Sequence, residues 1–77
     1  MSKFNPAYGS DVEEAVKVIN RLNDETELAR IAKEAWAWRA REAAVEKLTD
    51  ISVLNFVARN DKDWFVRNAA TRRLTEL

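Results

Sequence analysis

The feature that most constrains the fold of this chain is an internal repeat with a period of 26 residues. A fixed period of this kind is typical of proteins built from stacked repeats. When the 77-residue sequence is shifted by 26 positions against itself, eight of the 26 positions are identical. The identical pairs are Leu28/Leu54, Ala32/Ala58, Trp38/Trp64, Arg41/Arg67, Ala43/Ala69, Ala44/Ala70, Leu48/Leu74 and Thr49/Thr75. The register extends backwards as well, because Leu22 and Asp24 precede Leu48 and Asp50 by the same interval.

Each full repeat has the apolar spacing of two short helices. The first helix of a repeat carries apolar residues at positions i, i+3 and i+4, and the second carries them at i, i+4 and i+8. These sets are Leu28, Ile31 and Ala32 with Ala40, Ala44 and Leu48, then Leu54, Val57 and Ala58 with Val66, Ala70 and Leu74. The small alanines at the centre of the second stripe would let neighbouring helices approach closely. We therefore expect half a repeat at 11–24 and full repeats at 25–50 and 51–77.

Polar residues mark where these helices begin and end. Ser10 with Glu13 matches a capping box, and Asp24 and Asp50 are suitable N-caps for the helices that follow them. The polar stretch 60–63 can end one helix and begin another. The sequence predicts helices near 11–22, 25–34, 38–48, 51–59 and 63–75, with no strands.

The composition excludes several classes of chemistry. The chain has no cysteine and no histidine, so it lacks disulfides, thiolate metal sites and the commonest general base. It also has no Gly-rich phosphate loop and no nucleophile elbow, and no pair of carboxylates is set apart for acid–base work. We therefore predict no enzymatic activity, no catalytic residues, no cofactor and no metal.

The charge balance bears on partners and location. Thirteen basic and thirteen acidic side chains give a formal net charge of zero, so no global field attracts nucleic acid or an anionic membrane. No apolar run approaches the roughly 20 residues that span a bilayer, and the N-terminus lacks the apolar core of a signal peptide. We expect a cytoplasmic protein that does not bind membranes.

Two runs of residues resemble the second helix of a HEAT-like repeat. One is 66–70, preceded by 61–64 and followed by Leu74, and the other is 40–48. The resemblance covers residues 11–77, although a 26-residue period is shorter than the 40–47 residues common for HEAT units. It implies an all-α, right-handed alpha-solenoid of about two and a half helix-pair repeats. The first helices would form a convex outer layer and the second helices a concave inner one.

The resemblance also implies a ladder between neighbouring repeats, made by an Asp in the turn and an Arg early in the second helix. Asp61 or Asp63 with Arg67 matches this pattern, and Arg41 matches the Arg. The turn at 35–38, however, contains no Asp and no strong helix breaker, so both the ladder and the helix break are less well specified there.

Three tryptophans allow a structural and a functional interpretation. Trp38 and Trp64 precede equivalent helices, so they would serve as wedges between stacked units, with ligand stacking as the alternative. Trp36 replaces a Lys of the next repeat, so it would be either half-buried by the N-terminal segment or an exposed interaction anchor.

The remaining candidate site is a strip along the second helices. We expect a concave surface that binds another protein as a module or scaffold, and the alternative is a solvated face without a partner. The predicted partner-binding residues are Trp36, Arg39, Glu42, Glu46, Phe65, Asn68 and Arg72.

Two other functions remain open. The first is a self-associating structural unit, such as a homodimer or a fragment of a longer solenoid, because nothing in the sequence caps the C-terminal end of the stack. The second is weak binding of nucleic acid through the basic C-terminal helix, which the balanced net charge does not favour. At the other end, Pro6 and Gly9 make residues 1–10 irregular, and Phe4 and Tyr8 are expected to cover the first helix.

Overall fold

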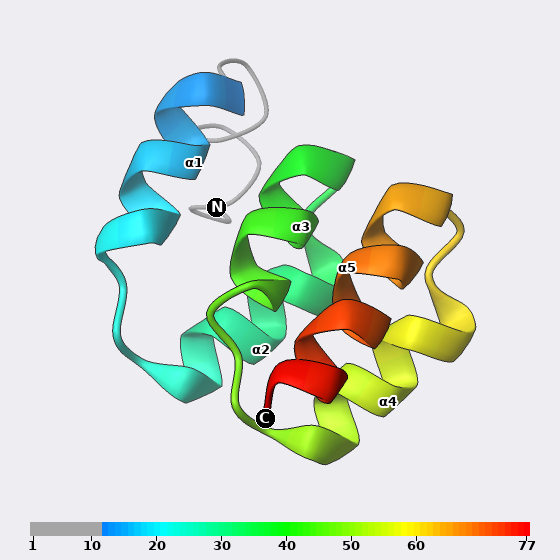
Figure 1. Ribbon diagram of the computed structural model, residues 1–77. Coiled ribbons are helices and arrows are strands. Elements are labelled where there is room, and N and C mark those ends of the chain that lie inside the picture. Colours follow the sequence, from blue (N-terminus) through cyan, green and yellow to red (C-terminus); the bar gives the residue numbers. More distant parts are fainter. Residues whose placement is uncertain (1–11) are drawn as a thin grey trace.

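The computed structural model describes residues 12–77. The predicted cap at Ser10 and the covering role of Phe4 and Tyr8 lie outside the described residues. Residues 12–77 form five helices and no strand (Figure 1), which confirms the all-α prediction for this part of the chain. The helices are α1 (Val12–Arg21), α2 (Glu25–Glu34), α3 (Trp38–Val45), α4 (Ile51–Asn60) and α5 (Trp64–Glu76).

The period of the sequence returns in the positions of the helices. Helices α2 and α4 begin at residues 25 and 51, and α3 and α5 begin at residues 38 and 64, so the equivalent starts within these two helix pairs are 26 residues apart. Helix α3 lies between α1 and α5, while α2 packs on α3 and α4 packs on α5 (Figure 1). The predicted boundaries agree except at the end of α3, which ends at Val45 because residues 46 and 47 form a turn toward α4.

Aspartates cap three of the helices at their N-termini. The Asp24 carboxylate accepts hydrogen bonds from the N–H groups of Thr26 and Glu27 at 2.9 and 3.2 Å. Asp50 accepts from two N–H groups of α4 at 3.0 and 3.2 Å, and Asp63 accepts from the first turn of α5 at 2.9 Å. These bonds satisfy N–H groups that have no partner within a helix. The predicted caps Asp24 and Asp50 are confirmed.

A single apolar core runs between the helices. The two central alanines predicted to be equivalent, Ala44 and Ala70, are both fully buried. Large side chains fill the space around them, and those that are fully buried are Ile19, Ile31, Leu48, Leu54, Val45, Val57 and Val66. The packing of the second helices therefore depends on small residues where helix axes meet and on branched residues at the periphery.

The break between α2 and α3 occurs where the sequence carries no stop signal. Helix α3 begins without a side-chain cap, because Ala37 occupies that position. Instead, the guanidinium of Arg41 donates from Nη1 to the carbonyl oxygens of Ala35 and Trp36 at 2.7 and 3.0 Å. A side chain from the following turn thus satisfies carbonyls that the break leaves outside the helix.

Candidate functional site

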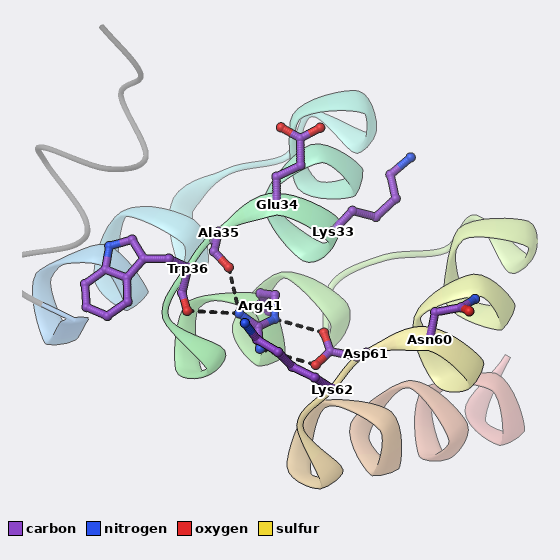
Figure 2. Close-up of a pocket in the computed structure, with 8 residues that line it drawn as sticks. All are labelled: Lys33, Glu34, Ala35, Trp36, Arg41, Asn60, Asp61 and Lys62. Carbon is purple, nitrogen blue, oxygen red and sulfur yellow. Dashed lines mark hydrogen bonds and ion pairs between the residues drawn. The ribbon is translucent and has the colours of Figure 1, made fainter.

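A buried ion pair joins the two helix pairs. Nε and Nη2 of Arg41 on α3 donate to the two carboxylate oxygens of Asp61, which follows α4, at 2.9 and 3.2 Å (Figure 2). Both side chains are only 7% exposed. The Asp61 carboxylate also accepts the N–H of Asp63 at 2.9 Å. A bidentate, fully hydrogen-bonded geometry is what a buried ion pair requires to offset desolvation.

This pairing corrects the predicted ladder. Asp63 caps α5, and Arg67 donates from Nη1 to the backbone carbonyl of Asp61 at 2.7 Å instead of pairing with either carboxylate. That bond matches the one from Arg41 to Ala35, since both donors and both acceptors are 26 residues apart. The aspartate therefore pairs with the Arg of the preceding unit, as a ladder between neighbours requires, and Arg67 has no carboxylate partner within residues 12–77.

The same position between α1 and α3 contains neither charge. The residues 26 positions before Arg41 and Asp61 are Ala15 and Ala35, and both alanines are buried. Because the acid and the base are replaced together, no unpaired charge is buried at this contact. The absence of Asp from the turn at 35–38 thus accompanies the absence of Arg at residue 15, the position in α1 that corresponds to Arg41.

A cavity of about 350 Å³ lies beside the ion pair. It is lined by Lys33, Glu34, Ala35, Trp36, Arg41, Asn60, Asp61 and Lys62 (Figure 2). Arg41 and Asp61 bind each other there, and the remaining charged side chains, Lys33, Glu34 and Lys62, are exposed. No group of three or more carboxylates that could hold a metal ion occurs within residues 12–77. Arg41 and Asp61 thus form one wall of the cavity, and exposed charged side chains surround its mouth.

Aromatic side chains form a continuous surface at the N-terminal turns of α3 and α5. We call Trp38, Phe65 and Trp64 the aromatic ledge. The Trp38 and Phe65 rings stack with centroids 5.0 Å apart and an interplanar angle of 22°. The Trp64 ring meets Phe65 edge-on at 5.2 Å and 79°. Both arrangements are favoured by the ring quadrupoles.

The two equivalent tryptophans differ in burial. Trp38 is partly buried against the core and covered on one face by Phe65. Trp64 is 60% exposed and Phe65 is 52% exposed. The predicted wedge role fits Trp38, but it was wrong for Trp64, because no following unit within residues 12–77 covers that ring.

Trp36 lies on the surface beside the ledge. It is 59% exposed, and the alternative that the N-terminal segment covers it involves residues outside the described part of the chain. A second hollow, of about 280 Å³, is lined by Val12, Trp36, Ala37, Trp38 and Arg39. This hollow places Trp36 and Arg39 next to the Trp38 end of the ledge.

Three of the predicted charged residues, Glu42, Glu46 and Arg72, come after the ledge residues of the same helices, toward the C-terminal ends of α3 and α5. Arg72 donates from Nη2 to Glu46 at 3.2 Å, which links the two helices, and both side chains are about half exposed. The pKa of Glu42 is raised by burial and by the neighbouring Glu46, against the opposing effects of Arg72 and Arg39. Five predicted site residues thus lie on α3 and α5, Asn68 among them, while Glu46 directly follows α3 and Trp36 precedes it.

The sequence interpretation missed the stacking between Trp38 and Phe65. Phe65 is one residue beyond Trp64, the counterpart of Trp38, so it falls on the neighbouring unit next to the Trp38 position. A comparison of each residue with its neighbours one period away would have indicated this contact.

Three basic residues of the C-terminal third make separate contacts within the protein. Arg67 binds the Asp61 carbonyl, Arg72 binds Glu46, and Arg73 donates to the Leu48 carbonyl at 2.8 Å. A phosphate-binding surface needs several cations directed to one track. The interactions of these three side chains do not support such a surface.

No helix within residues 12–77 is long and apolar enough to cross a membrane. A scan against models of protein families, a search of curated proteins and a search of solved structures each found no match to this chain.

Proposed function

We propose that this chain is a protein-binding module, built as a short right-handed HEAT-like solenoid that presents its aromatic ledge to a partner. The equal spacing of equivalent helix starts supports the solenoid. Similar contacts between units support it too, because Lys47 donates to the Asn20 carbonyl at 2.7 Å and Arg73 donates to the Leu48 carbonyl, two residues beyond the equivalent position, at 2.8 Å. Lys47 and Arg73 are 26 residues apart, and each reaches the C-terminal end of the preceding second helix.

The observation that carries the proposal is the exposure of the aromatic ledge. Side chains of this size bury 150–250 Å² each when they are covered, and Trp is enriched among the residues that dominate binding energy at interfaces. Phe65 and Trp64 leave half or more of that surface exposed, although neighbouring rings already hold them in position. Because neighbouring rings already hold these side chains in position, Trp64 and Phe65 would lose little side-chain entropy when a partner binds.

The surrounding side chains define the rim of the surface. Arg39 lines the hollow beside Trp38. Charged side chains lie further along the same helices than the ledge, toward the C-terminal ends of α3 and α5, and these are Glu42, Glu46 and Arg72. The exposed pair between Glu46 and Arg72 contributes little to stability, so it can exchange partners at small cost. The surface therefore suits a partner that inserts an apolar side chain over Phe65 and surrounds it with polar groups of both signs.

Quantitative affinity capture from cell extract tests this proposal. Phe65→Ala removes the centre of the ledge, whereas Phe56→Ala removes a phenylalanine of equal exposure, 52%, from α4. We expect at least one protein that binds the wild-type chain to be lost with Phe65→Ala and kept with Phe56→Ala. The circular-dichroism melts of both variants establish that they are folded. Identical capture by both folded variants would contradict the proposal.

A further inference from the structure

Arg41 and Arg67 occupy equivalent positions in the two helix pairs. Arg41 has a carboxylate partner, and Arg67 has none within residues 12–77. Arg41 uses Nη1 for carbonyl groups and uses Nε and Nη2 for Asp61. Arg67 uses Nη1 for the equivalent carbonyl, that of Asp61. Within residues 12–77 no carboxylate forms an ion pair with Arg67. Arg67 thus makes one of the two backbone contacts that hold Arg41, and its Nε and Nη2 groups have no carboxylate partner in the described part of the chain.

The residues around Arg67 form one surface, which we call the open flank. It is the face of α4 and α5 that corresponds to the face of α2 and α3 covered by the next helix pair. Each residue on it is more exposed than its counterpart 26 positions earlier. The pairs, with the more exposed residue first, are Ala58/Ala32, Trp64/Trp38, Arg67/Arg41, Thr71/Val45 and Leu74/Leu48. The open flank therefore repeats an interface already present inside the molecule.

The open flank also differs from that internal interface in two side chains. Val45 is buried, but its counterpart Thr71 is exposed and polar. The Glu25 carboxylate accepts from the N–H groups of Thr49 and Asp50 at 2.7 and 2.8 Å, which fixes the loop that enters α4. The counterpart of Glu25 is Ile51, which is exposed. A partner on the open flank would therefore contact the apolar Ile51, at the position where the loop entering α4 contacts the carboxylate of Glu25.

A second copy of this chain would not complete the open flank by two-fold pairing. Such pairing would offer Arg67 no free copy of Asp61, because that carboxylate is held by Arg41 within each chain. The charge of Arg67 instead requires a carboxylate from the occupant. We infer that the open flank docks a helix pair of a partner protein that carries an aspartate or glutamate in the turn between its helices, at the position that Asp61 has toward Arg41.

The probe for this inference is the chain's own acid-bearing helix pair, attached covalently. Residues 1–76 followed by a copy of residues 51–77 continue the 26-residue period and deliver a copy of Asp61 to Arg67. We expect Arg67→Gln to lower the folding equilibrium constant of the lengthened chain about a hundredfold more than that of the 77-residue chain. Changing the copied aspartate to asparagine should have a similar, non-additive effect. Arg73→Gln is the control, and its effect should be the same in both chains.

Two results would overturn the inference. One is an equal effect of Arg67→Gln in both chains, whether the copy fails to dock or docks without an ion pair. The other is a dimer of the 77-residue chain in sedimentation equilibrium that Arg67→Glu dissociates, since the occupant would then be a second copy. The inference is supported by the difference between the two chains together with a monomeric 77-residue protein.

Discussion

The two helix pairs, α2–α3 and α4–α5, follow one template but differ wherever a neighbour contributes to the environment. Ala44 and Ala70 are buried alike, because each lies within its own pair. Trp38 and Trp64 are identical residues at equivalent positions, yet only Trp38 is covered by a ring of the next pair. The comparison teaches that the template sets the position of a residue, and the neighbour determines its burial.

The neighbour supplies two specific groups to α2–α3. Asp61 binds Arg41, and Phe65 stacks on Trp38. Their absence on the far side of α4–α5 leaves Arg67 and Trp64 more exposed than their counterparts. Substitutions at equivalent positions should therefore have unequal effects, and the sizes of these differences test the comparison.

The largest effect is expected at the ion pair. Asp61→Asn leaves the buried guanidinium of Arg41 without its counter-charge and should cost about 3–5 kcal/mol of unfolding free energy. Asp63→Asn, two residues away, keeps a capping side chain for α5 and should cost about 1 kcal/mol or less. Urea denaturation followed by circular dichroism measures both. Equal losses would mean that the ion pair does not join the two helix pairs.

The next effect separates the two tryptophans. Trp38→Ala removes a partly buried ring from the core and from its stack on Phe65, and should cost about 2–3 kcal/mol, below the range for a fully buried Trp. Trp64→Ala removes a mostly exposed ring and should cost about 0.5–1 kcal/mol. The same denaturation experiment checks this. A larger loss for Trp64 would contradict the assigned environments.

A smaller difference is expected at the pair Val45 and Thr71. Val45→Thr buries a hydroxyl group between the helix pairs and should cost about 1–3 kcal/mol. The reverse change on the open flank, Thr71→Val, should change stability by no more than about 0.5 kcal/mol, because the side chain stays exposed. Thermal melts of the two variants provide the measurement, and equal destabilisation would contradict the difference in burial.

The smallest effect depends on pH and distinguishes Glu42 from its neutral counterpart Asn68. Burial, then Glu46, raises the pKa of Glu42, so the folded protein favours the protonated form. Below the pKa of the unfolded chain this preference stabilises the fold fully, and the stabilisation is lost as pH rises through the folded pKa. Glu42→Gln should therefore raise the melting temperature slightly at pH 7, with a difference that disappears near pH 3.

Asp50 provides the control of opposite sign. Hydrogen bonds from the side chain of Ser52 and the backbone of Val53 lower the pKa of Asp50. Its stabilisation is present above the pKa of the unfolded chain and is lost as pH falls through the folded pKa. Asp50→Ala should thus lower the melting temperature at pH 7, and the loss should diminish in acid. Parallel pH dependence of the two variants would contradict both assignments.

Much of the fold could be predicted from local patterns. The apolar spacing of the first and second helices, the aspartates at 24 and 50 and the 26-residue register located the helices, because most of these signals act within one or two turns. The break after α2 is less well specified by the sequence, since it depends on Arg41 binding the carbonyls of Ala35 and Trp36. Contacts of this kind require knowledge of where the following helix returns.

The candidate site was less predictable for the same reason. Arg39, Phe65 and Arg72 could be assigned to the surface from tolerance of unlike residues at equivalent positions. The partner of Asp61 could not be assigned, because two aspartates and two arginines fit the motif and the choice depends on the offset between units. Trp38 and Trp64 have the same residue type and the same local sequence signal, so only the neighbour distinguishes them.

A double-mutant cycle between Arg41 and Asp61 tests the central claim most directly. The free energies of unfolding are compared for the wild-type chain, Arg41→Gln, Asp61→Asn and the double variant. If the two helix pairs stabilise each other through this contact, the two changes should be coupled by about 2 kcal/mol, and the double variant should be little worse than either single one. Losses that simply add would show that the residues act separately, which would contradict the account.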